Sequence, residues 1–230
     1  LPQDYQQHTV ENNLAFLPLL GKQPVLPRHE LEIHLLAEEE AWAEAFMTEG
    51  GLGQRARLGI HVGSGGTKNL MLKRWPLDHY IELLKRLTRQ FPELAVLLFG
   101  GPEEEADLQK ILAVIQSPLL LRAPSRNLRQ AGALMKRCTA FLSVDTALMH
   151  LAAAVKAPGQ VVIEAPTLNK TNEPYANPFV LVRNPMVAGK NLDYYRYDGG
   201  GIRGTRQELI RCMASVSVEA VFESLAKVLF

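Results

Sequence analysis

Short apolar runs alternate with amphipathic helix patterns from residue 58 onward, and this alternation constrains the fold more than any other feature. Such short runs are typical of strands buried on both faces. They cover 58–62, 95–100, 119–122, 140–144, 160–165 and 179–182. Apolar stripes at helical spacing lie within 77–91, 108–115, 128–135 and 218–229. Strands that alternate with helices favour a parallel sheet covered on both faces. We therefore predict an α/β fold, a Rossmann-like parallel sheet with helices on both faces.

Composition excludes several classes of protein. The chain has 230 residues, of which 47% are hydrophobic and 21% charged, as in ordinary globular proteins. A net charge of +1 without a long basic run argues against a nucleic-acid partner. The only cysteines, Cys138 and Cys212, have neither disulfide-framework nor zinc-site spacing, which fits a reducing compartment. No apolar stretch reaches the roughly 18 residues of a membrane span. We expect a cytoplasmic protein.

Residues 1–56 have a different character from the rest. The chain opens on Leu1-Pro2-Gln3 without an initiator methionine, and its first 35 or so residues are proline-rich with little periodicity. A helix is predicted over 38–49. We interpret 1–56 as an interdomain linker and lead-in helix, and expect the chain to be part of a longer protein.

The turn after the fourth apolar run gathers chemically useful groups. Asp145 follows the run and is predicted to be the N-cap of a helix. A helix N-terminus presents free backbone N–H groups and a positive dipole end, which suit a phosphate. Asp145, Thr146 and His150 would bring a carboxylate, a hydroxyl and an imidazole to this turn. The alternative, that Asp145 only caps and His150 only packs, stays open.

A glycine-rich, cationic loop follows the first apolar run. It reads Gly63-Ser64-Gly65-Gly66-Thr67-Lys68, then Lys73-Arg74-Trp75-Pro76, where Pro76 is predicted to open a helix. The Rossmann fingerprint fails because position 68 is lysine, and the Walker pattern fails because threonine precedes Lys68. We predict a phosphate-binding loop of another type; a flexible surface loop is the alternative.

Ligands of parallel α/β sheets lie outside the carboxyl ends of the strands. Residues 63–68, 100–103 and 145–146 all follow predicted strands, so three polar clusters should meet at one edge. No Asp-x-Asp pair lies in these loops, and no metal site is predicted.

These motifs together resemble the family 9 glycosyltransferases, the ADP-heptose:lipopolysaccharide heptosyltransferases. The resemblance covers about residues 30–230, through 59–66, 73–76, 99–103, 145–146, 150–154, 165–167, 173–175 and 211–213. It implies the C-terminal, donor-binding domain of a GT-B fold. Residues 57–205 would form the nucleotide-sugar-binding domain, and 206–230 a C-terminal helix packing back toward an N-terminal domain outside this chain.

The resemblance implies eight donor-binding residues in the strand-end loops: Ser64, Gly65, Lys73, Glu103, Asp145, Thr146, Ala147 and His150. Lys73 would pair with the donor diphosphate, in a loop lined by Ser64 and Gly65. Glu103 would accept hydrogen bonds from the ribose hydroxyls.

Backbone N–H groups of Thr146 and Ala147 would bind the phosphate, while Asp145 and His150 would face the sugar or its phosphate. The family usually has glycine where this chain has Ala147. The segments 158–159 and 164–167 also depart from the family pattern, and the loop 67–72 is longer than expected.

The implied function is transfer of a heptose-like sugar from a nucleotide-diphosphate sugar, most simply ADP-heptose, to a lipopolysaccharide-core or related glycan. Transfer would be metal-independent, with the general base on the N-terminal domain and peripheral contact with the inner membrane. A GT-B sugar-nucleotide epimerase and a non-catalytic nucleotide-binding module are the alternatives.

Overall fold

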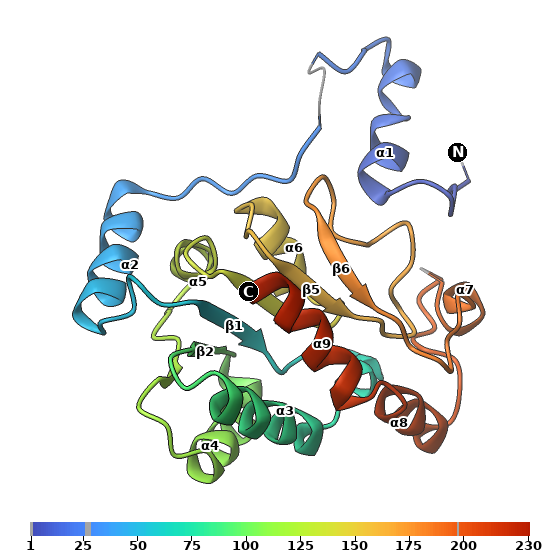
Figure 1. The fold of residues 1–230 in the computed structure, drawn as a ribbon. Helices are drawn as coiled ribbons and strands as arrows, with labels where there is room; N and C mark the ends of the chain where they lie inside the picture. Colours follow the sequence, from blue (N-terminus) through green and yellow to red (C-terminus); the bar gives the residue numbers. More distant parts are fainter. Residues whose placement is uncertain (1, 26–28, 197) are drawn as a thin grey trace.

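The computed structural model describes residues 2–25, 29–196 and 198–230 and contains one parallel sheet flanked by helices (Figure 1). The strands are β1 (Arg57–His61), β2 (Ala95–Phe99), β3 (Leu120–Arg122), β4 (Ala140–Ser143), β5 (Gln160–Ile163) and β6 (Phe179–Val182). The α-helices are α1 (Thr9–Leu14), α2 (Ala37–Glu49), α3 (Leu77–Gln90), α4 (Glu105–Val114), α5 (Leu128–Met135), α6 (Ala147–Ala154), α7 (Asn191–Tyr194), α8 (Arg206–Ala214) and α9 (Val218–Leu229). Short 3₁₀ helices lie at η1 (Leu17–Leu20), η2 (Leu70–Lys73) and η3 (Pro102–Glu104). The predicted α/β fold is confirmed.

The strand order β3-β2-β1-β4-β5-β6 places the first strand in the middle of the sheet. Every neighbouring pair is parallel, and Gly59 of β1 lies between Leu97 of β2 and Phe141 of β4. The chain runs outward from β1 in one direction through β2 and β3, and in the other through β4, β5 and β6. The order therefore reverses between β1 and β4, and a crevice for ligands is expected at their carboxyl ends.

Successive residues of each strand point to opposite faces of the sheet and contribute to two separate hydrophobic cores. Leu58 and Ile60 face a core completed by α3, α4 and α9, while Leu97 and Phe141 face another completed by α2, α5 and α6. Both faces of the sheet are covered, which explains why its strands read as continuous apolar runs.

Two glycines mark places where elements approach too closely for a side chain. A Cβ on Gly59 would lie 2.7 Å from the Phe141 ring, which packs edge-to-face on Phe99. A Cβ on Gly159 would lie 2.2 Å from Val228 of α9. The unusual segment 158–159 is thus the point where the C-terminal helix crosses the start of β5. Residues 206–230 form two helices, α8 and α9, and not the single C-terminal helix that was predicted. Helix α9 packs on the chain's own sheet, and the predicted packing toward another domain stays a prediction.

The N-terminal segment is more structured than its sequence pattern suggests. Residues 9–14 form α1 and residues 17–20 form η1, and α1 lies beside the loop that joins β5 to β6 (Figure 1). The Thr9 N–H donates to the Thr171 carbonyl at 2.8 Å, and the His8 ring stacks on Tyr175 with centroids 4.5 Å apart. Among the residues that the structure describes, none of the helices is both long and apolar enough to cross a membrane.

Candidate functional site

Thr146, in the turn from β4 into α6, is the N-cap of α6. The Thr146 side chain accepts a hydrogen bond from the Met149 N–H, and Thr146 has extended backbone angles. The prediction that Asp145 is the N-cap is therefore wrong by one residue, because the Asp145 carboxylate is held by other side chains. The N–H groups of Ala147 and Leu148, in the first turn, have no acceptor within the helix and can bind an anion.

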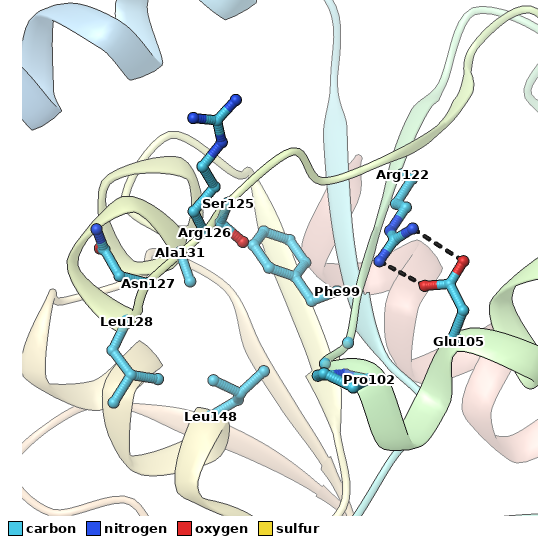
Figure 2. Close-up of a pocket in the computed structure, with 12 residues that line it drawn as sticks. Phe99, Pro102, Glu105, Arg122, Ser125, Arg126, Asn127, Leu128, Ala131 and Leu148 are labelled. Carbon is cyan, nitrogen blue, oxygen red and sulfur yellow. Dashed lines mark hydrogen bonds and ion pairs between the residues drawn. The ribbon is translucent and has the colours of Figure 1, made fainter.

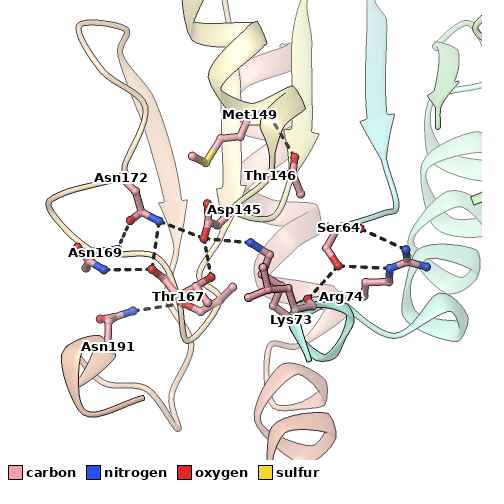
Figure 3. A network of polar contacts seen from close by, with 12 residues as sticks. Ser64, Lys73, Arg74, Asp145, Thr146, Met149, Thr167, Asn169, Asn172 and Asn191 are labelled. Carbon is pink, nitrogen blue, oxygen red and sulfur yellow. Dashed lines mark hydrogen bonds and ion pairs between the residues drawn. The ribbon is translucent and has the colours of Figure 1, made fainter. Parts of the chain in front are cut away.

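A buried ion pair lies beside this helix N-terminus (Figure 3). Lys73 Nζ, at the end of η2, lies 3.3 Å from Asp145 Oδ2, and each side chain is only 8% exposed. The same oxygen accepts hydrogen bonds from Thr167 Oγ1 at 2.5 Å and Asn172 Nδ2 at 3.1 Å. Three loops that are far apart in sequence thus fix one carboxylate and one cation next to a helix dipole.

The glycine-rich loop is folded around Ser64 and Arg74. Ser64 Oγ donates to the Leu70 carbonyl at 3.1 Å, and the Arg74 guanidinium donates to both the hydroxyl and the carbonyl of Ser64. Arg74 also pairs with the buried Glu104 at 3.0 Å. A Cβ on Gly63 would lie 2.3 Å from Glu104, so this position requires glycine, whereas Gly65 has nothing within 4 Å of its Cβ position. These contacts argue against a flexible surface loop.

The long loop at 67–72 is anchored to a distant segment. Asn69 donates from Nδ2 to the Ile202 carbonyl at 2.7 Å and accepts from the Ile202 N–H at 2.9 Å. Lys68 donates to the Gly199 carbonyl. The extra length therefore lets the loop reach the segment before α8.

Three consecutive glutamates after β2 have different environments. Glu104 is buried and accepts from the Gly101 N–H, while Glu105 pairs with Arg122. The Glu103 side chain is 64% exposed and lies 4.0 Å from Arg74. Its contact with a ribose stays a prediction.

A cavity of about 600 Å³ opens at the carboxyl ends of β2 and β3 (Figure 2). Residues 100–102 of the predicted cluster line it, whereas the contribution of residues 122–131 was not predicted. Phe99, Leu128 and Leu148 supply apolar walls, and the Arg122–Glu105 pair lies at one side. Leu148 belongs to the first turn of α6, so the cavity borders the helix N-terminus. The polar residues 125–127 after the third predicted strand were the signal that could have revealed it.

His61 is a second feature that the residue-type pattern did not reveal. It ends β1, is buried, and its Nδ1 lies 3.3 Å from the Thr146 hydroxyl. Burial, with a smaller contribution from the nearby Arg74 guanidinium, lowers the pKa of His61 to about 4. A neutral imidazole therefore holds the residue that caps α6.

His150 lies one turn into α6 and is half-buried. Burial lowers the pKa of its imidazole, and the Lys73 cation acts in the same direction, while the Asp145 carboxylate opposes them. His150 makes no side-chain hydrogen bond to any residue that the structure describes, so its predicted role in the site stays a prediction. Within the described part of the chain, no group of three His, Cys, Asp or Glu residues could hold a metal ion.

Comparisons with known proteins identify relatives of this chain. The family model for glycosyltransferase family 9 (heptosyltransferase) matches residues 1–196. Lipooligosaccharide heptosyltransferase 2 of Haemophilus influenzae is 31% identical over 159 residues, which cover 67% of this chain and 44% of that protein. Lipopolysaccharide heptosyltransferase 2 of Escherichia coli is 30% identical over 160 residues, which cover 66% and 42%. The chain therefore spans less than half the length of these curated relatives.

Solved structures share the fold. A family 9 glycosyltransferase from Veillonella parvula aligns with a TM-score of 0.74 at 19% identity, covering 100% of this chain and 62% of that one. Escherichia coli ADP-heptose lipopolysaccharide heptosyltransferase II aligns with a TM-score of 0.63 at 24% identity, covering 89% and 55%. These likenesses confirm the predicted fold, that of the GT-B glycosyltransferases. With a family model that matches most of its length, the chain belongs to glycosyltransferase family 9.

Proposed function

We propose that this chain is the donor-binding part of a glycosyltransferase that transfers a heptose-like sugar from ADP-heptose to a lipopolysaccharide-core or related glycan. The observation that carries the proposal is the position of the α6 N-terminus, between a nucleoside-sized cavity and a buried Lys73–Asp145 pair. The names of the curated relatives support this choice of donor and acceptor, and a further solved structure, the Escherichia coli heptosyltransferase WaaC with ADP, supports the choice of nucleotide.

The cavity of Figure 2 has the character of a nucleoside site. Its Phe99, Leu128 and Leu148 walls can pack against a flat base, while Ser125 and Asn127 offer hydrogen-bonding groups. A diphosphate attached to that nucleoside would extend past Leu148 to the free N–H groups of α6. The predicted phosphate contacts of Thr146 and Ala147 thus agree with the direction in which α6 points.

Lys73 supplies the cation for the diphosphate. Transfer of the sugar leaves a nucleoside diphosphate, whose charge grows in the transition state. A lysine that is buried and already fixed by Asp145 can stabilise this charge without reorganising, and the α6 dipole adds to it. We propose metal-independent transfer on this basis, with the general base for the acceptor hydroxyl on another part of the protein.

His61 is a positioning residue in this arrangement. Its contact with the Thr146 hydroxyl fixes the rotamer that caps α6, and hence the direction of the Ala147 and Leu148 N–H groups. A lipid-linked acceptor made at the inner membrane would place the protein on its cytoplasmic face, which is part of the same proposal.

Calorimetric titration of ADP and adenosine tests the proposal. Lys73→Ala should weaken ADP binding about 10- to 100-fold, because one charge-assisted contact is worth roughly 1.5–3 kcal/mol. Adenosine binding should stay within two-fold. Lys110→Ala is the matched control, since Lys110 is exposed on α4 and, among the residues that the structure describes, forms an ion pair only with Asp78. Equal losses for both ligands, or no ADP binding by the wild-type chain, would contradict the proposed function.

A further inference from the structure

A second cavity lies on the other face of α6. It has a volume of about 410 Å³, within the range of small-molecule sites, and is bounded by the N-terminal segment, the start of α6 and the turn at 171–172. His150 lines this cavity, whereas Leu148 lines the cavity of Figure 2. Residues two apart on a helix face nearly opposite directions, so the α6 N-terminus separates the two cavities.

The second cavity adjoins the Lys73–Asp145 pair through Asn172. The Asn172 amide donates to Asp145 Oδ2 at 3.1 Å, and the same residue lines the cavity wall. A ligand group in this cavity is therefore separated from the buried carboxylate by one side chain. If the nucleoside occupies the first cavity and the diphosphate the α6 N-terminus, the next group of the donor lies on this side.

The lining of the second cavity is uncharged, and it combines polar side chains with the apolar Val10 and Leu31. None of the described residues that line it is Lys, Arg, Asp or Glu. Two imidazoles contribute to it, and burial lowers the pKa of both His8 and His150, which favours their neutral forms. This chemistry disfavours a phosphate or carboxylate and suits hydroxyl groups, because amides, hydroxyls and neutral imidazoles each donate and accept.

His8 anchors the wall rather than contacting a ligand. Its Nδ1 accepts from the Val10 N–H at 3.1 Å, so Nε2 carries the proton and donates to the Glu173 carbonyl at 3.1 Å. Both ring nitrogens are used. The Thr9 hydroxyl, the Asn13 amide and the His150 ring form no hydrogen bond with other described residues, so these groups are among those that remain for a ligand.

We infer that this cavity binds the hydroxyl-rich, uncharged part of the sugar that the donor carries, and that α1 supplies one wall of the sugar subsite through Thr9 and Asn13. The inference rests on the proposed function, whose donor it extends beyond the diphosphate. It assigns a ligand-recognising role to a segment that the sequence pattern presents as a linker.

The test compares ADP with ADP-heptose, titrated into the 230-residue chain. Thr9→Val removes a hydroxyl at nearly constant shape, and Asn13→Ala removes an amide. Each should weaken ADP-heptose binding about three- to ten-fold, the range of one lost hydrogen bond, and leave ADP binding within two-fold. Gln6→Ala is the matched control, because Gln6 is an exposed amide of the same segment that does not line the cavity. His8→Ala, which removes the anchor, should give a loss of ADP-heptose affinity at least as large.

The outcomes separate the two proposals. If the wild-type chain binds neither ligand, the proposed function fails and this inference fails with it. If ADP binds but both variants retain the wild-type ratio of ADP-heptose to ADP affinity, with unchanged melting temperatures, the sugar subsite is wrong while the proposed function stands. If the variants weaken only the binding of a lipopolysaccharide-core oligosaccharide, the cavity belongs to the acceptor and the assignment to the donor is overturned.

Discussion

The two cavities beside α6 are built in different ways. The one in Figure 2 is lined by residues 99–131 plus Leu148, so consecutive strands, loops and helices of the sheet form nearly all of it. The other joins residues 3–13 to His150 and the turn at 171–172, and α1 contributes no residue to the two main cores. The first cavity should therefore be as stable as the domain, whereas the second depends on the docking of a short peripheral segment.

The largest expected effect concerns the ion pair between the two cavities. Asp145→Ala would leave Lys73 as a buried charge without its carboxylate, and such a change costs about 3–5 kcal/mol. Urea denaturation of the wild type and the variant measures this cost. A destabilisation near 1 kcal/mol would show that Lys73 reaches solvent when its partner is removed.

The next effect is a pH dependence of the free energy of unfolding, which arises from His61 at the end of β1. The pKa of His61 is about 4 in the folded chain and about 6.5 in the unfolded chain, so between these values the unfolded chain binds more protons. The contribution of His61 to the free energy of unfolding is complete above pH 6.5 and is lost as the pH falls to 4, by roughly 3 kcal/mol.

His61→Gln isolates this contribution, because glutamine does not titrate and the acidic groups common to both proteins cancel. The difference in the free energy of unfolding between wild type and variant should decrease by roughly 3 kcal/mol from pH 7 to pH 4. A constant difference across this range would mean that folding does not lower the pKa of His61.

A smaller effect is expected at the cap of α6. Thr146→Ala should lower the free energy of unfolding by about 1 kcal/mol, and Thr146→Ser should restore most of it, because serine caps as well as threonine. ADP binding should weaken in parallel in the alanine variant if the cap orients the phosphate-binding N–H groups. Unchanged ADP affinity would leave the cap with a structural role only.

The smallest effect on global stability is expected in the N-terminal segment. Tyr175→Phe removes the hydroxyl that donates to Glu11 and should change the free energy of unfolding by less than about 0.5 kcal/mol. Amide hydrogen exchange in α1 should nevertheless become faster, because the docking of this helix depends on few contacts. Equal protection of the α1 amides from hydrogen exchange in both proteins would mean that the second cavity is no less stable than the first.

Much of the site could be predicted from local sequence, and the misses have physical causes. The strand-end loops at 63–68, 100–103 and 145–146 were found because buried strands have a clear apolar pattern. Asp145 was misplaced as the N-cap because adjacent Asp and Thr are both good caps, and only the tertiary partners Lys73, Thr167 and Asn172 decide between them. His61 was missed as a positioning residue because a lone histidine at a strand end carries no periodic signal.

The sequence by itself determined the strands, the helices that alternate with them and hence the parallel sheet with its ligand edge, because burial on two faces imposes a local apolar pattern. It also carried the family's motifs. Only the tertiary structure decided which carboxylate meets Lys73, why loop 67–72 is long, and where α1 docks. These features depend on single contacts between residues up to 165 positions apart, such as His8 with Glu173. Such contacts leave no periodic trace in the chain, since they involve one side chain and one partner rather than a repeated face.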